Sequence, residues 1–296
     1  MGMLEMVFLA ASRPWIFVGI CIGLLVWGLF PVVLCEGWFY EGVRKAKFLR
    51  RGTCAAVLLI LLRFGGEFLL SLSGLSWRRW VKTALLLFLL GLAGMLFASV
   101  AALRQEEVKR MIAYSSSAQI SYIFLALGLG SDAGMIAACY QILAHAMTKS
   151  MIFLGAGEMI RAPGGHYWGE LRGAARLAPL GGLAFTIGGL SLCGLPLLAG
   201  FSAKYCIAGA ALEAGWQTFP ALFGLAASSV LNAMYYIPAI LAIWGRKRAG
   251  EEQPLVWDWS DKPGKGTLVV LLAGNVFLGT AFGPVWELLQ QGVALF

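Results

Sequence analysis

The sequence predicts an all-α polytopic membrane protein with about eight transmembrane helices, and three observations support this fold class. Hydrophobic residues make up 59% of the 296 residues, charged residues make up only 13%, and the mean hydropathy is +0.78. A water-soluble domain typically carries about 25% charged residues. The apolar residues also fall into runs near the ~20 residues that cross a hydrocarbon core of ~30 Å. Segments of this length span lipid as helices, because a helix satisfies its own backbone hydrogen bonds.

Eight apolar runs define the expected helices in order along the chain. They cover residues 14–34, 54–73, 81–103, 111–130, 134–157, 178–210, 217–245 and 267–292. The longest polar stretch between them is the loop at 246–266. We expect the sixth helix, about 178–210, to be discontinuous, because it is longer than one crossing requires and carries helix breakers in its middle.

The distribution of Lys and Arg predicts the topology. With eight spans, sixteen of the 23 basic residues lie in the first, third, fifth and seventh loops, and four lie on the opposite side. The positive-inside rule then places both termini on the outer side of the membrane. This topology explains the net charge of +8, so we expect no nucleic-acid partner. The N-terminus has an acid at Glu5 and no basic n-region, unlike a signal peptide. These features favour a prokaryotic inner (plasma) membrane, with an organelle membrane as the alternative.

The sequence shows no pattern of a catalytic centre. The six cysteines form no CxxC pair, and there is no nucleotide-binding glycine loop, no cysteine set for an iron–sulfur cluster and no spaced histidine pair for haem. We therefore expect no cofactor and no metal site in this chain. If the protein takes part in a redox reaction, the cofactors belong on other subunits.

The fifth expected span carries three polar residues on one face. Gln141, His145 and Lys149 are four residues apart, a spacing that stacks their side chains along a helix. A charge at bilayer depth costs at least ~2.5–3.5 kcal/mol, so it needs a reason to be there. Histidine can accept and donate a proton, and a lysine in a low-dielectric site can exchange one near neutral pH. The stripe predicts a proton relay; the alternative is a polar stripe that fastens helices together.

The sixth expected span contains the helix breakers Gly194, Pro196 and Gly200, and Lys204 follows the proline by eight residues. Proline removes a backbone donor and clashes with the preceding turn, so the helix should break here. Broken helices at membrane depth are typical of transporters, where they lie within protein or beside a water-filled cavity. Lys204 is therefore a candidate functional lysine. The alternatives are a simple proline kink and a lysine that extends to the membrane surface.

Four further polar residues are accessory candidates. Arg63 and Glu67 of the second span are four residues apart and can pair on one face, which lowers the penalty of burial without implying conduction. Tyr114 and Ser117 lie at the start of the fourth span. These two could line a wet path or hydrogen-bond to their own helix.

Several strings resemble the antiporter-like membrane subunit family of respiratory complex I (NADH:quinone oxidoreductase), Mrp cation/proton antiporters and energy-converting hydrogenases. The resemblance covers about residues 55–290, with its motifs in the family's order. In chain order, the strings are LRQEEVKRMIAYSSSAQISYIFLALGLG, AHAMTKSMIFLGAGEMI, GGLSLCGLPLLAGFSAKYCI and SSVLNAMYYIPAILAIW.

The resemblance implies a mechanism and roles for three residues. In the family, two inverted repeats each contain a broken helix with a buried lysine or glutamate, and protons move between these sites along a polar axis at mid-membrane. Lys204 would be the broken-helix site of the second repeat, and His145 and Lys149 would be the axis groups that feed it. Residues 51–296 would form an antiporter-like transmembrane domain with the first repeat largely missing. Residues 1–50 would be a divergent N-terminal span and basic loop.

Together these features predict a proton- or cation-translocating membrane subunit, carrying H⁺ or Na⁺. Its complex would be a redox-driven NADH:quinone oxidoreductase-like pump or an Mrp-type antiporter. The expected partners are other membrane subunits, joined by flavin or iron–sulfur subunits in a redox-driven complex. The alternatives are a non-conducting scaffold subunit, a split or truncated fragment of a conducting subunit, and a stand-alone secondary transporter, which would normally need both repeats.

Overall fold

The computed structural model describes residues 77–161, 165–245 and 262–293. Within these ranges every regular element is a helix, apart from one isolated antiparallel bridge between Glu107 and Tyr167. The all-α prediction is therefore confirmed for the described part of the chain. The first two expected spans lie outside it, and so do Arg63 and Glu67.

The described helices follow the expected spans from the third onward. They are α4 (Trp77–Leu103), α5 (Val108–Gly128), α6 (Asp132–Arg161), α7 (Ala174–Leu177), α8 (Pro179–Cys193), α9 (Ala199–Leu212), η1 (Gly215–Gln217), α10 (Thr218–Trp244), α11 (Lys262–Thr280) and α12 (Phe282–Val293). By length and hydropathy alone, two of them could cross a membrane, or three if the bent pair α11 and α12 counts as one span. The expected number of about eight spans is not confirmed.

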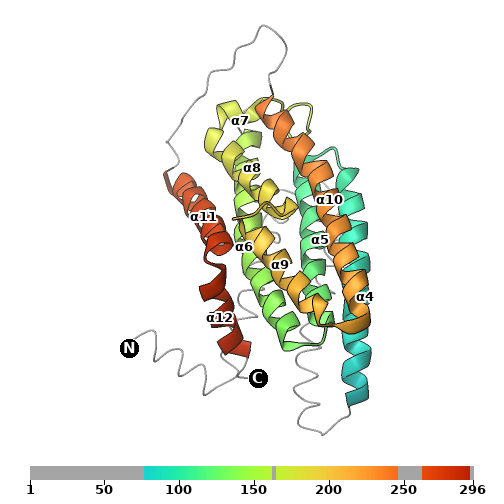
Figure 1. Ribbon diagram of the computed structural model, residues 1–296. Helices are drawn as coiled ribbons and strands as arrows, with labels where there is room; N and C mark the ends of the chain where they lie inside the picture. Colours follow the sequence, from blue (N-terminus) through green and yellow to red (C-terminus); the bar gives the residue numbers. More distant parts are fainter. Residues whose placement is uncertain (1–76, 162–164, 246–261, 294–296) are drawn as a thin grey trace, which may run out of the picture.

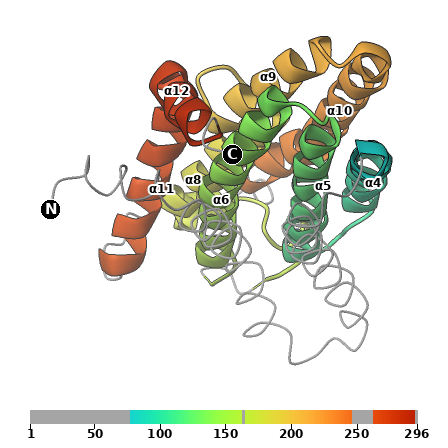
Figure 2. The same cartoon turned by 90° about the horizontal axis from the view of Figure 1, so that it is seen from below.

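Helix α6 is the centre of the bundle. It packs against α5, α8, α9, α11 and α12, and Figures 1 and 2 show these helices arranged around it. Helix α4 lies on the outer side of α5, and α10 packs against α4, α8 and α9. The polar stripe of α6 is enclosed as a result, because Gln141, His145 and Lys149 are all buried.

Glycines bring α4 and α5 into backbone contact. A Cβ atom at Gly91 of α4 would lie 2.7 Å from the Cα of Leu125 on α5, and one at Gly128 of α5 would collide with the backbone of Phe88 on α4. Membrane helices commonly associate through small residues, because dispersion contacts between closely packed backbones drive their association in lipid.

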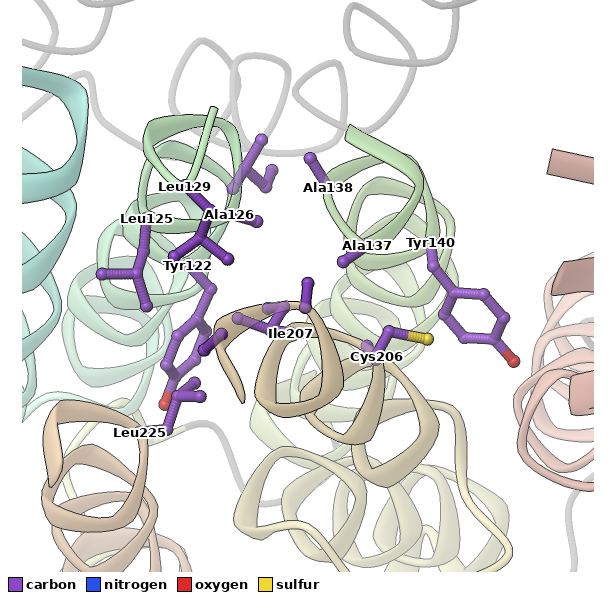
Figure 3. Packing of buried hydrophobic residues seen from close by; sticks show 14 of the residues in the cluster. Tyr122, Leu125, Ala126, Leu129, Ala137, Ala138, Tyr140, Cys206, Ile207 and Leu225 are labelled. Carbon is purple, nitrogen blue, oxygen red and sulfur yellow. The ribbon is translucent and has the colours of Figure 1, made fainter. Parts of the chain in front are cut away.

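A hydrophobic cluster fills the space between α5, α6 and α9. Figure 3 shows Ile207 of α9 facing the gap between the other two helices, with Tyr122 on the α5 side and Ala137 on the α6 side. The small alanine side chains of α6 leave room for α9 to approach. A second cluster, around Phe185 of α8 and Tyr236 of α10, fills the other end of the bundle.

The expected span 267–292 is two helices rather than one. The break falls at Ala281, where α11 and α12 are inclined at 81° to one another. Pro284 accounts for the break, because it has no N–H to donate to the carbonyl of Thr280 four residues earlier. The neighbouring carbonyl of Gly279 accepts a hydrogen bond from the Ser202 hydroxyl at 3.1 Å. The bend is therefore fixed against α9.

Candidate functional site

The sixth expected span is broken where the sequence predicts. Helix α8 ends at Cys193, and the next residue, Gly194, has a φ of +99°, a left-handed conformation that glycine adopts without strain. Pro196 stands four residues after Leu192 and has no N–H, so the Leu192 carbonyl finds no donor in its own helix. The break therefore releases a backbone acceptor inside the bundle.

Lys204 uses this released carbonyl. Its Nζ donates to the Leu192 carbonyl oxygen at 2.6 Å and to the Ser229 hydroxyl at 2.9 Å. The same Nζ lies 5.6 Å from the ring centroid of Tyr122, which is within the range of a cation–π contact. The half-buried lysine thus reaches from α9 back to the end of α8, and its amine sits at the helix break.

Gly200 permits the close approach of α9 to α8. Its N–H donates to the Ser191 hydroxyl at 2.9 Å, and a Cβ at this position would collide with the carbonyl oxygen of Ser191. Each of the three predicted break residues therefore has its own part in the geometry. Gly194 turns the chain, Pro196 releases the carbonyl, and Gly200 allows the second helix to begin beside the first.

Lys149 is fully buried between α5, α6 and α10. Its Nζ donates to the Ser115 hydroxyl, to the Tyr236 hydroxyl at 3.3 Å and to the Ile112 carbonyl at 3.3 Å. The two hydroxyls also bond to one another, at 2.7 Å. The amine therefore contacts two groups that can each donate and accept a proton.

Polar side chains of α10 lie between the two lysine sites. The Asn232 amide nitrogen donates at 3.1 Å to the Leu192 carbonyl, which is the acceptor of Lys204, and the Asn232 amide oxygen accepts from the Tyr235 hydroxyl. Tyr235 is adjacent to Tyr236, with ring centroids 4.9 Å apart. Two turns of α10 therefore connect the surroundings of Lys204 with those of Lys149.

The other two residues of the α6 stripe differ in their contacts. The Gln141 amide nitrogen donates to the side-chain oxygen of Gln119 at 3.1 Å and to its backbone carbonyl at 3.3 Å. His145 is buried, and neither of its ring nitrogens has a hydrogen-bond partner among the residues that the structure describes. The structure therefore gives Gln141 a packing contact with α5 and gives His145 no fixed partner in that part of the chain.

The accessory candidates on α5 lie outside the lysine contacts. Tyr114 is partly buried beside the second hydrophobic cluster, and the Ser117 hydroxyl bonds at 3.5 Å to the carbonyl of Ala113 in its own helix. Their neighbour Ser115 reaches Lys149 instead. For Ser117, the geometry matches the alternative of a bond to its own helix.

Four side chains that contact the lysines or lie between their sites were not predicted from the sequence. They are Ser229, Asn232, Tyr235 and Tyr236. The signal was available, because these residues recur every three or four positions along the apolar span 217–245 and so share one helix face. A stripe of this kind was recognised on α6, where it contains charged residues, and was overlooked on α10, where its members are neutral.

The electrostatic surroundings of both lysines consist of neutral groups. In the ranges 77–161, 165–245 and 262–293, neither lysine forms an ion pair with a carboxylate, whereas Arg110 and Glu107 pair at 2.6 Å near the start of α5. The same ranges hold no group of three or more His, Cys, Asp or Glu residues placed to bind a metal ion. The described site therefore offers amines, hydroxyls and carbonyls rather than an acidic cation cage.

Comparison with known proteins places these features in a family. Residues 6–230 match the family model described as NADH:quinone oxidoreductase/Mrp antiporter, TM, a match that includes most of residues 1–50. NADH-quinone oxidoreductase subunit N 2 of Sorangium cellulosum is 31% identical over 267 residues, which cover 86% of this chain and 50% of the relative. The chain thus spans about half the length of that curated relative.

Two solved structures have the same fold. A chain of the membrane-bound sulfane sulfur reductase, an archaeal respiratory membrane complex, aligns with a TM-score of 0.62 and 32% identity over 74% of this chain and 43% of that chain. A chain of the Mrp complex from Dietzia sp. aligns with a TM-score of 0.63 over 72% of this chain and 47% of that chain. The second alignment has 22% identity, so it bears on the fold alone.

Proposed function

The chain belongs to the transmembrane family of NADH:quinone oxidoreductases and Mrp antiporters, and on this premise we propose that it is a proton-translocating membrane subunit of a multi-subunit complex. One observation carries the proposal. Two lysines, Lys149 and Lys204, lie inside a membrane domain and are joined by polar side chains of α10. Lysines at membrane depth are rare because they are costly, and they mark ion pathways and proton relays.

The chemistry of the site favours H⁺ over Na⁺ as the transported ion. An amine binds a proton covalently, whereas an ammonium group repels a metal cation and has no lone pair to offer it. A bound cation such as Na⁺ requires several oxygen ligands, and carboxylates are the usual means of balancing its charge. The groups beside the two lysines are hydroxyls and backbone carbonyls. We therefore assign proton carriage to Lys149 and Lys204, with His145 as a further relay group.

The test is proton flux through the complex purified from native membranes in mild detergent and reconstituted into vesicles. Flux is followed with an enclosed pH-sensitive dye under an imposed potassium diffusion potential, so that the natural driving reaction is not required. Lys149→Ala and Lys204→Ala are each expected to lower the flux about tenfold or more, because each removes a proton carrier. Arg172→Ala removes an exposed positive charge at the end of the bundle and should leave the flux unchanged.

The same experiment separates conduction from a scaffold role. A scaffold subunit would assemble normally, and the flux would not respond to loss of either lysine. Unchanged flux in both Lys149→Ala and Lys204→Ala, with the partner subunits still co-purifying, would therefore refute the proposal and leave the scaffold as the better account.

We also propose that the full assembly contains other membrane subunits in the prokaryotic inner membrane, with about eight helices in this chain and both of its termini on the outer side. Mass spectrometry of the purified complex tests the partners. Flavin or iron–sulfur subunits in the preparation point to a redox-driven quinone reductase. Small multi-spanning subunits alone point to a cation/proton antiporter. A chain that purifies alone contradicts the multi-subunit proposal.

A further inference from the structure

Asn232 occupies a position between the two lysine sites in which every hydrogen-bonding group of its amide is used. The amide nitrogen donates to the Leu192 carbonyl at 3.1 Å and to the Tyr122 hydroxyl at 3.5 Å, and the amide oxygen accepts from Tyr235. The side chain is completely buried. The chemistry of the partners fixes the orientation of the Asn232 amide. The Leu192 carbonyl oxygen is an acceptor, so it must face the amide nitrogen, which donates, and not the amide oxygen.

This orientation fixes groups on both sides. On one side, Asn232 and Lys204 share the Leu192 carbonyl, which Pro196 leaves without a donor in its own helix. On the other side, the amide oxygen accepts the hydrogen bond of the Tyr235 hydroxyl and so holds the Tyr235 side chain in place. The Tyr235 ring lies beside that of Tyr236, with ring centroids 4.9 Å apart.

Tyr236 completes the connection, because its hydroxyl is an acceptor of Lys149 and a partner of Ser115. Asn232 thus lies between the two amines, bonded on one side to the acceptor of Lys204 and on the other to Tyr235, whose ring contacts that of Tyr236. A buried amide of this kind serves as a rigid bridge between hydroxyls and carbonyls, since it does not itself change protonation.

We propose that Asn232 is a positioning residue that couples the two lysine sites, holding the Leu192 carbonyl for Lys204 and the Tyr235 side chain against Tyr236, which is a partner of Lys149. The inference rests on the proposed function. The net step is the movement of one proton from the ammonium group of one lysine to the neutral amine of the other. The Ser115 and Tyr235 hydroxyls and the Asn232 amide have the same protonation before and after the step.

The test uses the reconstituted complex and the proton-flux assay described above. Asn232→Leu keeps the size of the side chain and removes its polar atoms, and we expect the flux to fall about tenfold, the size of effect that the loss of about one hydrogen bond gives. Tyr235→Phe removes only the hydroxyl and should lower the flux by a similar factor. Asn232→Leu and Tyr235→Phe break the same connection, so the flux of the double variant should be no lower than that of either single variant.

Asn275→Leu is the matched control. Asn275 is also a completely buried asparagine in a membrane helix, and it donates at 2.7 Å to the Thr148 hydroxyl of α6, outside the connection between the lysines. Its replacement removes the same chemical group at a comparable depth. The flux of Asn275→Leu should match that of the unmodified complex.

Asn232→Asp gives a readout that a purely structural role would not change. When protonated, the new carboxyl can donate to the Leu192 carbonyl and accept from Tyr235, so flux should persist at acidic pH. When ionised, it repels that carbonyl and holds the ammonium group of Lys204, so flux should fall as the pH rises. A structural asparagine would give a pH profile parallel to that of the unmodified complex.

The outcomes separate this inference from the function on which it rests. If Lys149→Ala and Lys204→Ala abolish the flux while Asn232→Leu or Tyr235→Phe leaves its rate and pH profile unchanged, the coupling role fails and conduction stands. Equal losses in Asn232→Leu and Asn275→Leu also overturn the coupling role, because the loss is then general to buried amides. If neither lysine variant affects the flux, conduction itself fails. Should Asn232→Leu not assemble, the shape-conserving Tyr235→Phe and Asn232→Asp variants decide the question.

Discussion

At the scale of single residues, the surroundings of Lys149 remain satisfied without the lysine. Ser115 and Tyr236 bond to each other, and the Ile112 carbonyl accepts from Ser115 and from Ser116, each at 2.9 Å. A polar group that fastens helices together leaves unpaired partners behind when it is removed, and those unpaired groups are costly. Removal of Lys149 would leave none of its three partners unpaired. The contacts of Lys149 are therefore those expected of a residue that exchanges protons, rather than of one that stabilises the packing of its helices.

Lys149→Met is expected to preserve stability while it abolishes proton flux. Methionine has a similar length and is apolar, so the change removes the penalty of burying an amine and leaves the neighbouring hydroxyls paired. We expect the unfolding free energy in detergent to change by less than about 1 kcal/mol or to increase. Thermal unfolding of the purified chain measures this. A loss of about 3 kcal/mol, the size seen when a structural buried ion pair is broken, would identify Lys149 as a structural group.

The two lysines of the candidate site could be predicted from the sequence, whereas its neutral side chains on α10 were missed. Lys149 and Lys204 were identified because a charge within an apolar run is costly and therefore informative. Asn232 and Tyr236 carry no such penalty in the sequence, since a neutral polar residue in a membrane helix is common and its partner lies on another helix. The Leu192 carbonyl could be anticipated only by combining Pro196 with the rule that proline lacks an N–H.

At the scale of helices, the break between α8 and α9 depends on close backbone contact. Gly200, in the first turn of α9, lies directly against the carbonyl of Ser191, and a side chain there would meet that carbonyl. The contact is rigid, because the colliding atom belongs to the backbone and cannot rotate away. The position of Lys204, one turn further along α9, follows from it.

Gly200→Ala should therefore destabilise the protein although it adds a single methyl group. Forcing extra volume into a packed site costs about 1–3 kcal/mol, and we expect a lower midpoint of thermal unfolding in detergent. Gly209→Ala is the control in the same helix, because a Cβ there meets nothing within 4 Å. That change should be neutral or stabilising, since alanine favours helix by about 1 kcal/mol over glycine. Equal midpoints for the two variants would show that the contact at Gly200 is not tight.

The loop after α6 contains a carboxylate whose charge orders the backbone. Glu170 accepts hydrogen bonds from the backbone N–H groups of Tyr167 at 3.0 Å and His166 at 2.8 Å, and these two bonds lower the pKa of its carboxyl from the ordinary value of 4.5. The ionised form is the one stabilised, because a carboxylate accepts better than a carboxylic acid. The loop in turn pairs with the start of α5, through a bond from the Val108 N–H to the His166 carbonyl at 3.2 Å.

The order of this loop should depend on pH. Since folding lowers the pKa of Glu170, its contribution is complete above the ordinary value of 4.5 and is lost as the pH falls through the lowered value. Hydrogen exchange at the His166 and Tyr167 amides measures this loss. The Glu170→Gln variant is compared at each pH, so that the intrinsic pH dependence of exchange cancels. The ratio of the two exchange rates should approach one at low pH; a constant ratio would show that the carboxylate does not order the loop.

At the scale of the whole molecule, sequence patterns predicted which segments are helices better than where they bend. Helices α4, α5, α6 and α10 coincide with expected spans, and α8 and α9 together coincide with the sixth, whereas the short α7 lies between spans. Long apolar segments are predictable in this way because in lipid they must satisfy their own backbone hydrogen bonds as helices. The bend at Ala281 was missed, although Pro284 stands in the sequence, because the short segment after it was included in the same apolar run. The break at Pro196 was expected because the run containing it was too long for one crossing.

The two ends of the bundle can be told apart by their contacts and charges. At one end, the residues before α5 pair with the loop after α6, and the Gly173 N–H donates to the Ala242 carbonyl of α10 at 3.1 Å. This end gathers the basic residues Arg104, Lys109, Arg110, Arg161, Arg172 and Arg176. At the other end, the Gln217 amide nitrogen donates to the Gly128 carbonyl at 3.1 Å, which joins the end of α5 to the start of α10. The third and fifth loops, which the charge pattern places on one side, therefore meet in space.

This arrangement predicts the orientation of the protein in its membrane. Because Lys and Arg are retained on the inner side, the end with Arg172 should face the cytoplasm, and the end with Glu213, between α9 and α10, should face outward. Single cysteines are introduced as Arg172→Cys and Glu213→Cys after the six native cysteines are replaced by alanine. Both positions are exposed, so a membrane-impermeant maleimide can reach either one. In intact spheroplasts, only Glu213→Cys should be labelled, and Arg172→Cys should react after permeabilisation. The reverse pattern would show that the basic end faces outward, and the assignment of both termini to the outer side, which rests on the same charge rule, would fail with it.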